Sequence, residues 1–151
     1  MAGNIKGFHD RQANPVRIVP ETDKQNIDYK MCTAYTDGTK LNIEMALVAN
    51  ALGYRTDLVG MHGPRAAHVE NVPEKCDLEG MRNRGSPVVD YVLGIQPGVG
   101  VFVVGHCDHS YQKSMLAYCK LGDGPWYVFY RPYQLCHVKT LRCAAEAVLD
   151  G

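Results

Sequence analysis

The chain has 151 residues, of which 46% are hydrophobic and 21% charged, as in an ordinary globular protein of one domain. Its 16 basic residues balance 16 acidic ones, so no overall field favours nucleic acid or an anionic membrane as a partner. No run of about 18 apolar residues is present, and the first residues lack the apolar core of a secretory signal. The sequence therefore predicts a cytoplasmic protein without a nucleic-acid or membrane partner.

The six cysteines are scattered, and no Cys-x-x-Cys pair occurs. This spacing argues against a zinc ribbon or a thioredoxin-type centre. Without an export signal, free buried thiols in a reducing cytosol are the simplest interpretation, and disulfides remain the alternative.

The N-terminal part predicts a lead-in followed by a strand. Residues 1–30 are polar and mixed, and Pro15 and Pro20 interrupt any long helix. We expect an irregular, partly helical linker over this segment and a single domain over residues 31–151. Residues 28–36 alternate crudely between polar and apolar side chains, which favours a strand leading into Asp37.

The next segment predicts a helix whose first turn carries a cation. Asp37 or Thr36 is typical of an N-cap, and Gly53 is typical of the residue that ends a helix. Lys40 opposes the helix dipole at a cost of roughly 0.3–1 kcal/mol, and an ammonium beside free backbone donors suits a phosphate or carboxylate. The alternative is a solvent-facing Lys40 loosely paired with Asp37 or Glu44.

Two sets of apolar positions indicate that this helix is covered on more than one face. Such coverage would place Lys40 and Glu44 in a cleft instead of open water. The first set is Leu41, Met45, Val48 and Leu52, and the second is Ile43 and Leu47.

The remaining sequence predicts a sheet and a final helix. Residues 60–90 are rich in glycine, proline and charge and favour a long loop around His62. Residues 109–119 fit a short helix without excluding a strand. Predicted strands occupy Val88–Gly94, Val99–Gly105 and Trp126–Arg131, separated by turns at residues 95–98 and 122–125, and a helix occupies Thr140–Leu149. The fold class is α+β, a mixed or antiparallel sheet packed with two or three helices.

No nucleotide-binding fingerprint is present. The Gly-x-Gly sequences at Gly98 and Gly122 open a strand and form a turn, and neither is a Gly-x-Gly-x-x-Gly between strand and helix. A phosphate-binding P-loop is also missing. We therefore expect this chain alone to bind neither NAD nor ATP.

Two clusters carry groups that could contact a substrate. Residues 106–109 read His-Cys-Asp-His and predict a metal site, a substrate contact at His106 or His109, or a plain polar strand end. Neighbouring side chains of an extended chain point in alternating directions, which disfavours the metal. Arg131 offers a planar fork and Tyr133 a hydroxyl for an anion; Arg131 stacked on Tyr130 or Trp126 is the alternative.

Three motifs resemble one family: residues 36–45, residues 60–64, and residues 122–125 with 129–133. They resemble the central catalytic domain of the homoserine-dehydrogenase-like, SAF-domain NAD(P)-dependent oxidoreductases, which include the 1-deoxyxylulose 5-phosphate reductoisomerase-like enzymes. The resemblance implies that NAD(P)H is bound by a Rossmann domain. This chain has neither that domain nor the SAF domain, so we expect an excised catalytic and self-association domain.

The resemblance also implies roles for individual residues. Catalytic roles fall to Lys40, Asp37 and Tyr133, and substrate contacts to Thr39, Arg131, His62 and His106. The implied activity is reduction of a small phosphorylated or carboxylated carbonyl compound by a homo-oligomer that depends on its cofactor domain. A non-catalytic anion-binding or oligomerisation module is the alternative, and metal-dependent hydrolysis at residues 106–109 is a third hypothesis.

Overall fold

The computed structural model describes residues 1–7, 9–95, 98–132 and 136–149. Its centre is a mixed five-stranded sheet, which confirms the α+β prediction. The strands are β1 (Ala2–Lys6), β2 (Arg55–Thr56), β3 (Val88–Leu93), β4 (Val101–His106) and β5 (Trp126–Arg131). Their order is β2-β3-β1-β4-β5, in which β1 runs parallel to β3 and antiparallel to β4.

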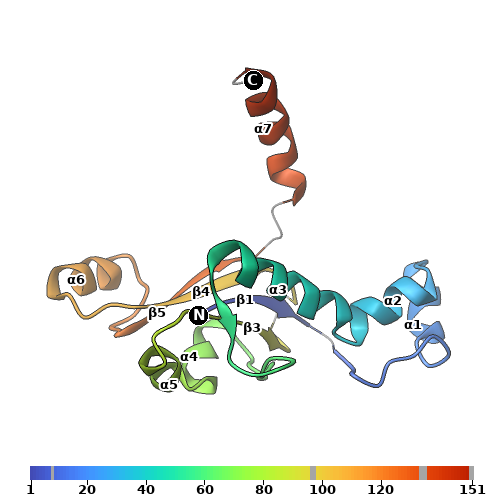
Figure 1. Cartoon of the computed structure of the whole chain (residues 1–151), viewed down its shortest axis with the longest axis horizontal. Helices are drawn as coiled ribbons and strands as arrows, with labels where there is room; N and C mark the ends of the chain where they lie inside the picture. The colour runs from blue at the N-terminus through green and yellow to red at the C-terminus, as the bar shows by residue number, and fades with distance from the viewer. Residues whose placement is uncertain (8, 96–97, 133–135, 150–151) are drawn as a thin grey trace.

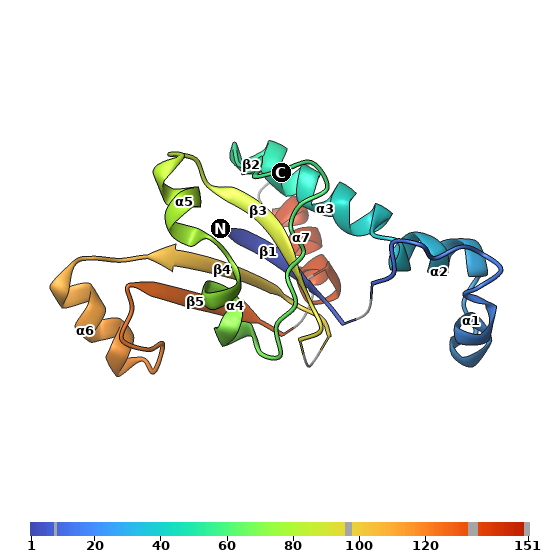
Figure 2. The same cartoon turned by 90° about the horizontal axis from the view of Figure 1, so that it is seen from below.

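Helices cover the two faces of the sheet unequally (Figures 1 and 2). The described helices are α1 (Val19–Gln25), α2 (Tyr29–Thr36), α3 (Thr39–Leu52), the 3-10 helix η1 (Val69–Asn71), α4 (Val72–Lys75), α5 (Leu78–Asn83), α6 (Ser110–Tyr118) and α7 (Cys136–Leu149). α3 lies along one face, whereas α4 and α5 lie against the other, and α7 extends away from the sheet (Figure 1). None of the helices in the described part of the chain has the length and apolar character needed to cross a membrane.

Each face of the sheet has its own core. On the α3 face, Leu41 and Met45 pack with Tyr91 of β3. On the opposite face, Ile5 of β1 packs with Val72 of α4. Because both faces of β3 are covered, all six of its residues are buried, and its sequence is apolar except for Asp90.

The α3 face is covered only in part. β4 and β5 present apolar side chains on this face beyond the reach of α3, and Val103 stands opposite Phe129 in the strand register. Val101 is 37%, Val103 47% and Phe129 46% exposed. These three residues form an uncovered apolar strip.

The expectation of an irregular lead-in is wrong for Ala2–Lys6, which form the central strand of the sheet. Ala-Gly-Asn-Ile-Lys is a poor strand sequence by propensity. It is extended because neighbouring strands bond both of its edges and because Ile5 is only 2% exposed. Tertiary pairing therefore decides the conformation here.

The strand predicted for residues 28–36 is wrong, because Tyr29–Thr36 form α2. Asp28 caps this helix, since its Oδ1 accepts the backbone N–H groups of Lys30 and Met31, each at 3.0 Å. The buried side chains Cys32 and Thr36 are four residues apart and share one face of the helix.

The predicted helix after Asp37 is confirmed: it ends at Leu52, and Gly53 adopts the left-handed conformation. The structure differs from the prediction in two respects, the N-cap residue and the number of covered sides. Its N-cap is Gly38, although Asp37 Oδ1 accepts the N–H of Thr39 at 2.8 Å. The expected second covered side is wrong: Ile43 and Leu47, the two members of that set, are 54% and 62% exposed.

The later elements follow the predictions with one exception. The strands ending at Leu93, His106 and Arg131 and the final helix are confirmed, and residues 110–118 form a helix. The long loop predicted for residues 60–90 contains η1, α4 and α5, whose single turns are too short to show a periodic pattern. The predicted turn at Gln96 and Pro97 lies outside the described residues.

Candidate functional site

A cavity of about 650 Å³ lies at the carboxyl end of β1, a size that suits a small metabolite. Lys6, the last residue of β1, lies on its wall together with Arg17 and Tyr35. Alternation along the strand places Lys6 and Asn4 on the α3 side and Ile5 on the other. The remaining lining residues are Gly7, Asp10, Ala13, Ile18, Ile27, Cys32, Thr36 and Gly98.

Two ammonium groups meet at one aromatic ring beside this cavity. Nζ of Lys40 lies 4.5 Å and Nζ of Lys6 lies 5.9 Å from the centre of the Tyr35 ring. Burial lowers the pKa of Lys6, and the charge of Lys40 lowers that pKa further, while Glu44 opposes both effects. The arrangement gathers positive charge at the end of β1.

The only carboxylate in direct contact with this pair, among the described residues, is already engaged. Glu44 Oε1 lies 3.4 Å from Nζ of Lys40, and Glu44 Oε2 accepts a hydrogen bond of 3.1 Å from Asn4. Lys6 forms no ion pair within 4.0 Å with any carboxylate of the described residues. Lys6 is thus a half-buried cation that has no direct counter-ion in the described part of the chain.

The start of α3 lies beside these lysines. Helix geometry leaves the N–H groups of Lys40 and Leu41 without intrahelical acceptors, because the first intrahelical bond runs from Asn42 to Gly38. The Lys40 side chain is 45% exposed and paired with Glu44, as in the simpler of the two expectations for it. Its position suits an anion because Lys6 adds a second cation.

His9, a residue that no sequence pattern singles out, supports this helix start. His9 Nδ1 lies 2.9 Å from the carbonyl oxygen of Thr36, which can only accept, so Nδ1 carries the proton. The ring also fills the space beside Gly38, where an added Cβ would lie 2.6 Å from Cε1 of His9. His9 therefore fixes the turn at Gly38 that precedes α3.

Arg131 lies at the same end of the sheet as Lys40, but it lines a groove that is separate from the cavity at Lys6. Asn4, Val101 and Arg131 are register neighbours across three strands, so two strand spacings, about 10 Å, separate the backbones of Asn4 and Arg131. Arg131 is exposed and lines a groove of about 640 Å³ with Met45 and the apolar strip. None of the cavities found in the described part of the chain contains both Lys40 and Arg131. Tyr133 lies outside the described residues.

His62 belongs to a separate ion cluster. Its Nε2 lies 2.8 Å from Asp57, whose other oxygen lies 2.7 Å from Arg84. The buried carboxylate of Asp90 accepts the backbone N–H groups of His62 and Gly63, which attaches this loop to β3. Among the described residues, no hydrogen bond or ion pair joins His62 to the lysine pair.

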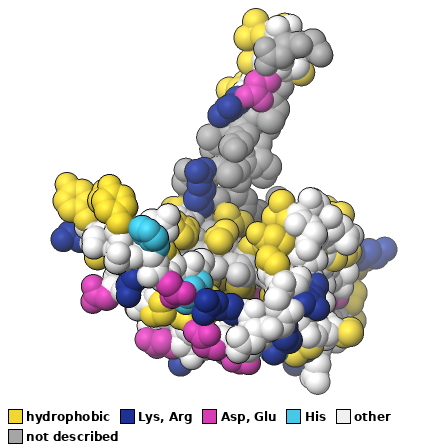
Figure 3. All heavy atoms as spheres, turned by 60° about the vertical axis from the view of Figure 1, so that its left-hand side comes forward, with side chains coloured by type: hydrophobic (Ala, Val, Ile, Leu, Met, Phe, Trp, Pro, Cys, Tyr) yellow, Lys and Arg dark blue, Asp and Glu magenta, His cyan; other side chains and the backbone are white. Residues whose placement is uncertain are grey.

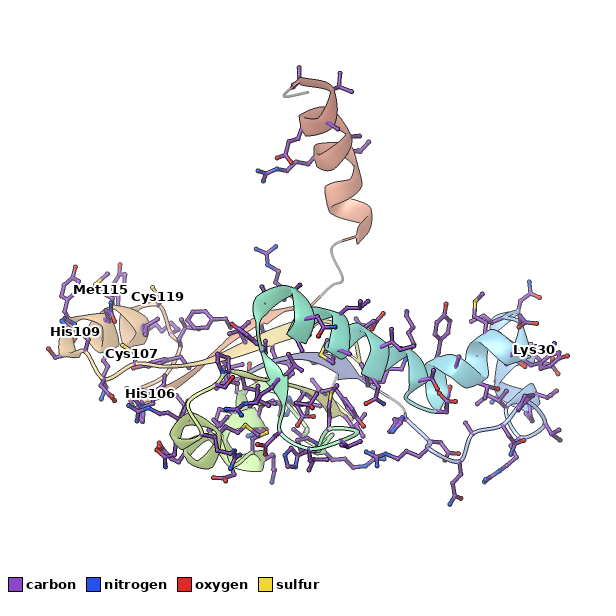
Figure 4. The ribbon with its side chains drawn as sticks, viewed as in Figure 1. Lys30, His106, Cys107, His109, Met115 and Cys119 are labelled. Atoms are coloured by element: carbon purple, nitrogen blue, oxygen red, sulfur yellow. The ribbon has the colours of Figure 1, made fainter. Side chains whose placement is uncertain are left out.

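His106 lies at the opposite end of β4 from Val101, far from the start of α3. Its Nε2 lies 3.2 Å from Asp108, and its ring packs edge-on against Trp126 at 4.7 Å between centres. Figure 4 shows His106, Cys107 and His109 on the strand and loop leading to α6. Figure 3 shows acidic, basic and histidine side chains gathered on this surface. Among the described residues, no three side chains are grouped as metal ligands.

Sequence reasoning missed Lys6, Arg17 and Tyr35. Lys6 fell in the segment interpreted as a linker, and no local pattern marks it. Tyr35 and Lys40 are five residues apart on either side of the turn at Gly38, and only the helical course of both segments brings them together.

Comparison with known proteins identifies the family. A family model described as "Oxidoreductase DRL, catalytic domain" matches residues 1–140, most of the chain. None of the curated proteins matches significantly. The chain belongs to the DRL oxidoreductase catalytic-domain family.

Proposed function

We propose that this catalytic domain binds a small phosphorylated or carboxylated carbonyl compound at the end of β1 and takes part in its reduction. The observation that carries the proposal is the pair of ammonium groups at the Tyr35 ring, with Lys6 on the wall of the 650 Å³ cavity and Lys40 beside it. Among the described residues, a single carboxylate, that of Glu44, is in direct contact with this pair. An anionic group beside both ammonium groups would supply the missing negative charge. The free N–H groups at the start of α3 add donors for the same group.

The proposed chemistry converts a carbonyl group into an alcohol. The sequence has no dinucleotide fingerprint, so we propose that NAD(P)H, which supplies the hydride, is held by another domain. Arg17 binds the anionic end of the substrate, and Lys6 adds positive charge beside it. The ammonium of Lys40 then donates a hydrogen bond to the oxygen that gains negative charge, and that oxygen finally acquires a proton.

The same placement defines what each predicted residue contributes. Asp37 orders the first turn of α3 through the N–H of Thr39, and we propose that it positions Lys40 without contacting the substrate. Arg131 is proposed to contact only a substrate long enough to extend from the cavity into the neighbouring groove. Tyr133 remains a proposed donor to the same oxygen.

Replacement of Lys40 tests the proposal directly. One preorganised donor to a developing oxyanion is worth about 2.7–4 kcal/mol, so Lys40→Ala should lower kcat by about 10²–10³-fold in a protein that joins this domain to its cofactor domain. Lys30→Ala, on the exposed start of α2, is the matched control and should leave kcat unchanged. A loss below tenfold for Lys40→Ala would remove Lys40 from the chemistry.

We also propose that the domain associates with a second copy of itself through the apolar strip. Val101, Val103 and Phe129 are side chains of strands whose opposite face is packed in the core, so their exposure is unlike that of isolated surface residues. This association does not depend on the redox proposal.

A further inference from the structure

Lys6 combines a place on the cavity wall with an unusual electrostatic setting. It is half-buried, has no direct ion-pair partner among the described residues and shares the Tyr35 ring with Lys40. Burial lowers its pKa, as does the neighbouring ammonium. An amine in such a setting is neutral, and therefore nucleophilic, more often than an ordinary surface lysine.

The groups that act on the pKa of Lys6 come from two helices, α3 and α2. Lys40 and Glu44 approach from α3, where Lys40 lowers the pKa of Lys6 and Glu44 raises it. Cys32 approaches from α2 and also raises that pKa. Burial and the charge of Lys40 outweigh the opposing effects of Glu44 and Cys32, so the pKa of Lys6 is lowered.

The rest of the cavity wall offers complementary contacts to a bound molecule. Arg17 provides a planar guanidinium that suits a phosphate or carboxylate. Ile18 and Ile27 provide apolar surface for a short carbon skeleton. A molecule with an anionic group at one end and a carbonyl at the other would thus place the carbonyl near the amine of Lys6.

We propose that Lys6 is a carbonyl-reactive lysine that forms a reversible imine with an anionic aldehyde in this cavity. Nζ attacks the carbonyl carbon, a C=N bond replaces the C=O bond, and the oxygen leaves as water. The balance is R–CHO + Lys6–NH₂ → R–CH=N–Lys6 + H₂O, with no change in oxidation state. The ligand's position rests on the proposed anion site, whereas the covalent bond is additional to the proposed reduction.

The test uses the 151-residue chain and pyridoxal 5′-phosphate, an aldehyde that carries a phosphate. Borohydride reduces any imine to a stable amine, and peptide mass spectrometry then gives the extent of labelling at each lysine. Lys6 should be labelled about tenfold or more faster than the exposed Lys30, because the docked phosphate raises the local aldehyde concentration. Labelling of Lys6 no faster than Lys30 would overturn the proposal.

Two further arms separate this proposal from the proposed anion site. Pyridoxal lacks the phosphate, and inorganic phosphate competes for the anion site without reacting. One outcome is that pyridoxal labels Lys6 as preferentially as pyridoxal 5′-phosphate does, and that inorganic phosphate does not inhibit the labelling. This outcome supports the reactive amine and overturns the anion site. Binding of phosphate without preferential labelling supports the anion site and overturns the imine.

A variant pair tests the role of the neighbouring ammonium. Lys40→Met removes the cation that lowers the pKa of Lys6, so labelling by pyridoxal should slow at neutral pH and recover at strongly alkaline pH. Lys30→Met, the control, should leave the rate of Lys6 labelling unchanged at both neutral and strongly alkaline pH. Unchanged labelling of Lys6 in Lys40→Met at neutral pH would contradict the activation by Lys40.

Discussion

Asn4 and Glu44 form a hydrogen bond of 3.1 Å that links the central strand to α3. This bond holds one oxygen of Glu44, while the other oxygen lies 3.4 Å from Nζ of Lys40. Glu44 therefore forms its ion pair with Lys40 and forms none with Lys6. The excess positive charge at the end of β1 therefore results from a specific side-chain arrangement.

Removal of the Glu44 charge should strengthen anion binding. Glu44→Gln keeps the size of the side chain but leaves both lysines without their nearest carboxylate. Partly exposed ion pairs are worth about 0.2–1 kcal/mol, so inorganic phosphate should bind about two- to fivefold more tightly, as measured by calorimetry. Glu70→Gln, an exposed change in η1, is the control. Weaker phosphate binding in Glu44→Gln would mean that Glu44 supports the anion site instead of opposing it.

The two glycines that bound α3 should differ in their tolerance of alanine. Gly38 and Gly53 both have positive φ angles, 92° and 67°, which cost an alanine roughly 1–2 kcal/mol. At Gly53 nothing lies within 4 Å of the added Cβ, whereas at Gly38 the Cβ would displace the ring of His9. Urea unfolding should therefore show a larger loss of stability for Gly38→Ala. Equal losses would contradict the supporting role of His9.

Acid should destabilise the protein in part through Asp57. The hydrogen bond from His62 holds the pKa of Asp57 below its usual value, and the charge of Arg84 acts in the same direction. A carboxyl group with a depressed folded-state pKa stabilises the fold above its unfolded-state pKa, near 4, and loses that contribution as the pH falls through the folded-state value. In Asp57→Asn, the free energy of unfolding should vary less with pH below about 4. Parallel pH profiles for the variant and the wild type would contradict the assignment.

Self-association should depend on the apolar strip. Val103→Lys places a charge at the centre of the strip, opposite Phe129, and should weaken association at least about tenfold because a buried unpaired charge costs several kcal/mol. Val16→Lys changes a side chain that is 82% exposed elsewhere and should have no effect. Sedimentation velocity measures both. A wild-type chain that stays monomeric at high concentration would contradict the proposal.

Much of the fold could be predicted from local pattern. The apolar runs of β3 and β4, the aromatic run of β5 and the stripe of α3 with Gly53 at its end each carry their own signal. The failures have physical causes. Ala2–Lys6 is a strand only because two partners bond it, and Tyr29–Thr36 is a helix begun by Asp28, a capping signal that the crude alternation of residues 28–36 outweighed.

The site was predictable only to the extent that it lies within one element. Lys40 was selected because a cation at a helix start conflicts with the helix dipole. Its partner Lys6 lies 34 positions earlier in the sequence and is joined to it by strand pairing and helix packing, which no local pattern encodes. His62 and His106 were selected from a loop and a strand end and from the family resemblance, and the structure places each in its own ion cluster.

The most direct test of the anion site at Lys6 and Lys40 is a titration of the chain with inorganic phosphate, followed by the amide signals of the protein in solution NMR. The account predicts that the amides of Lys40 and Leu41 and the residues around Lys6 shift together with one dissociation constant, and that Lys6→Met abolishes the response. The amides near His106 should not move. Uniform small shifts at all surface lysines, or a full response in Lys6→Met, would contradict the central claim.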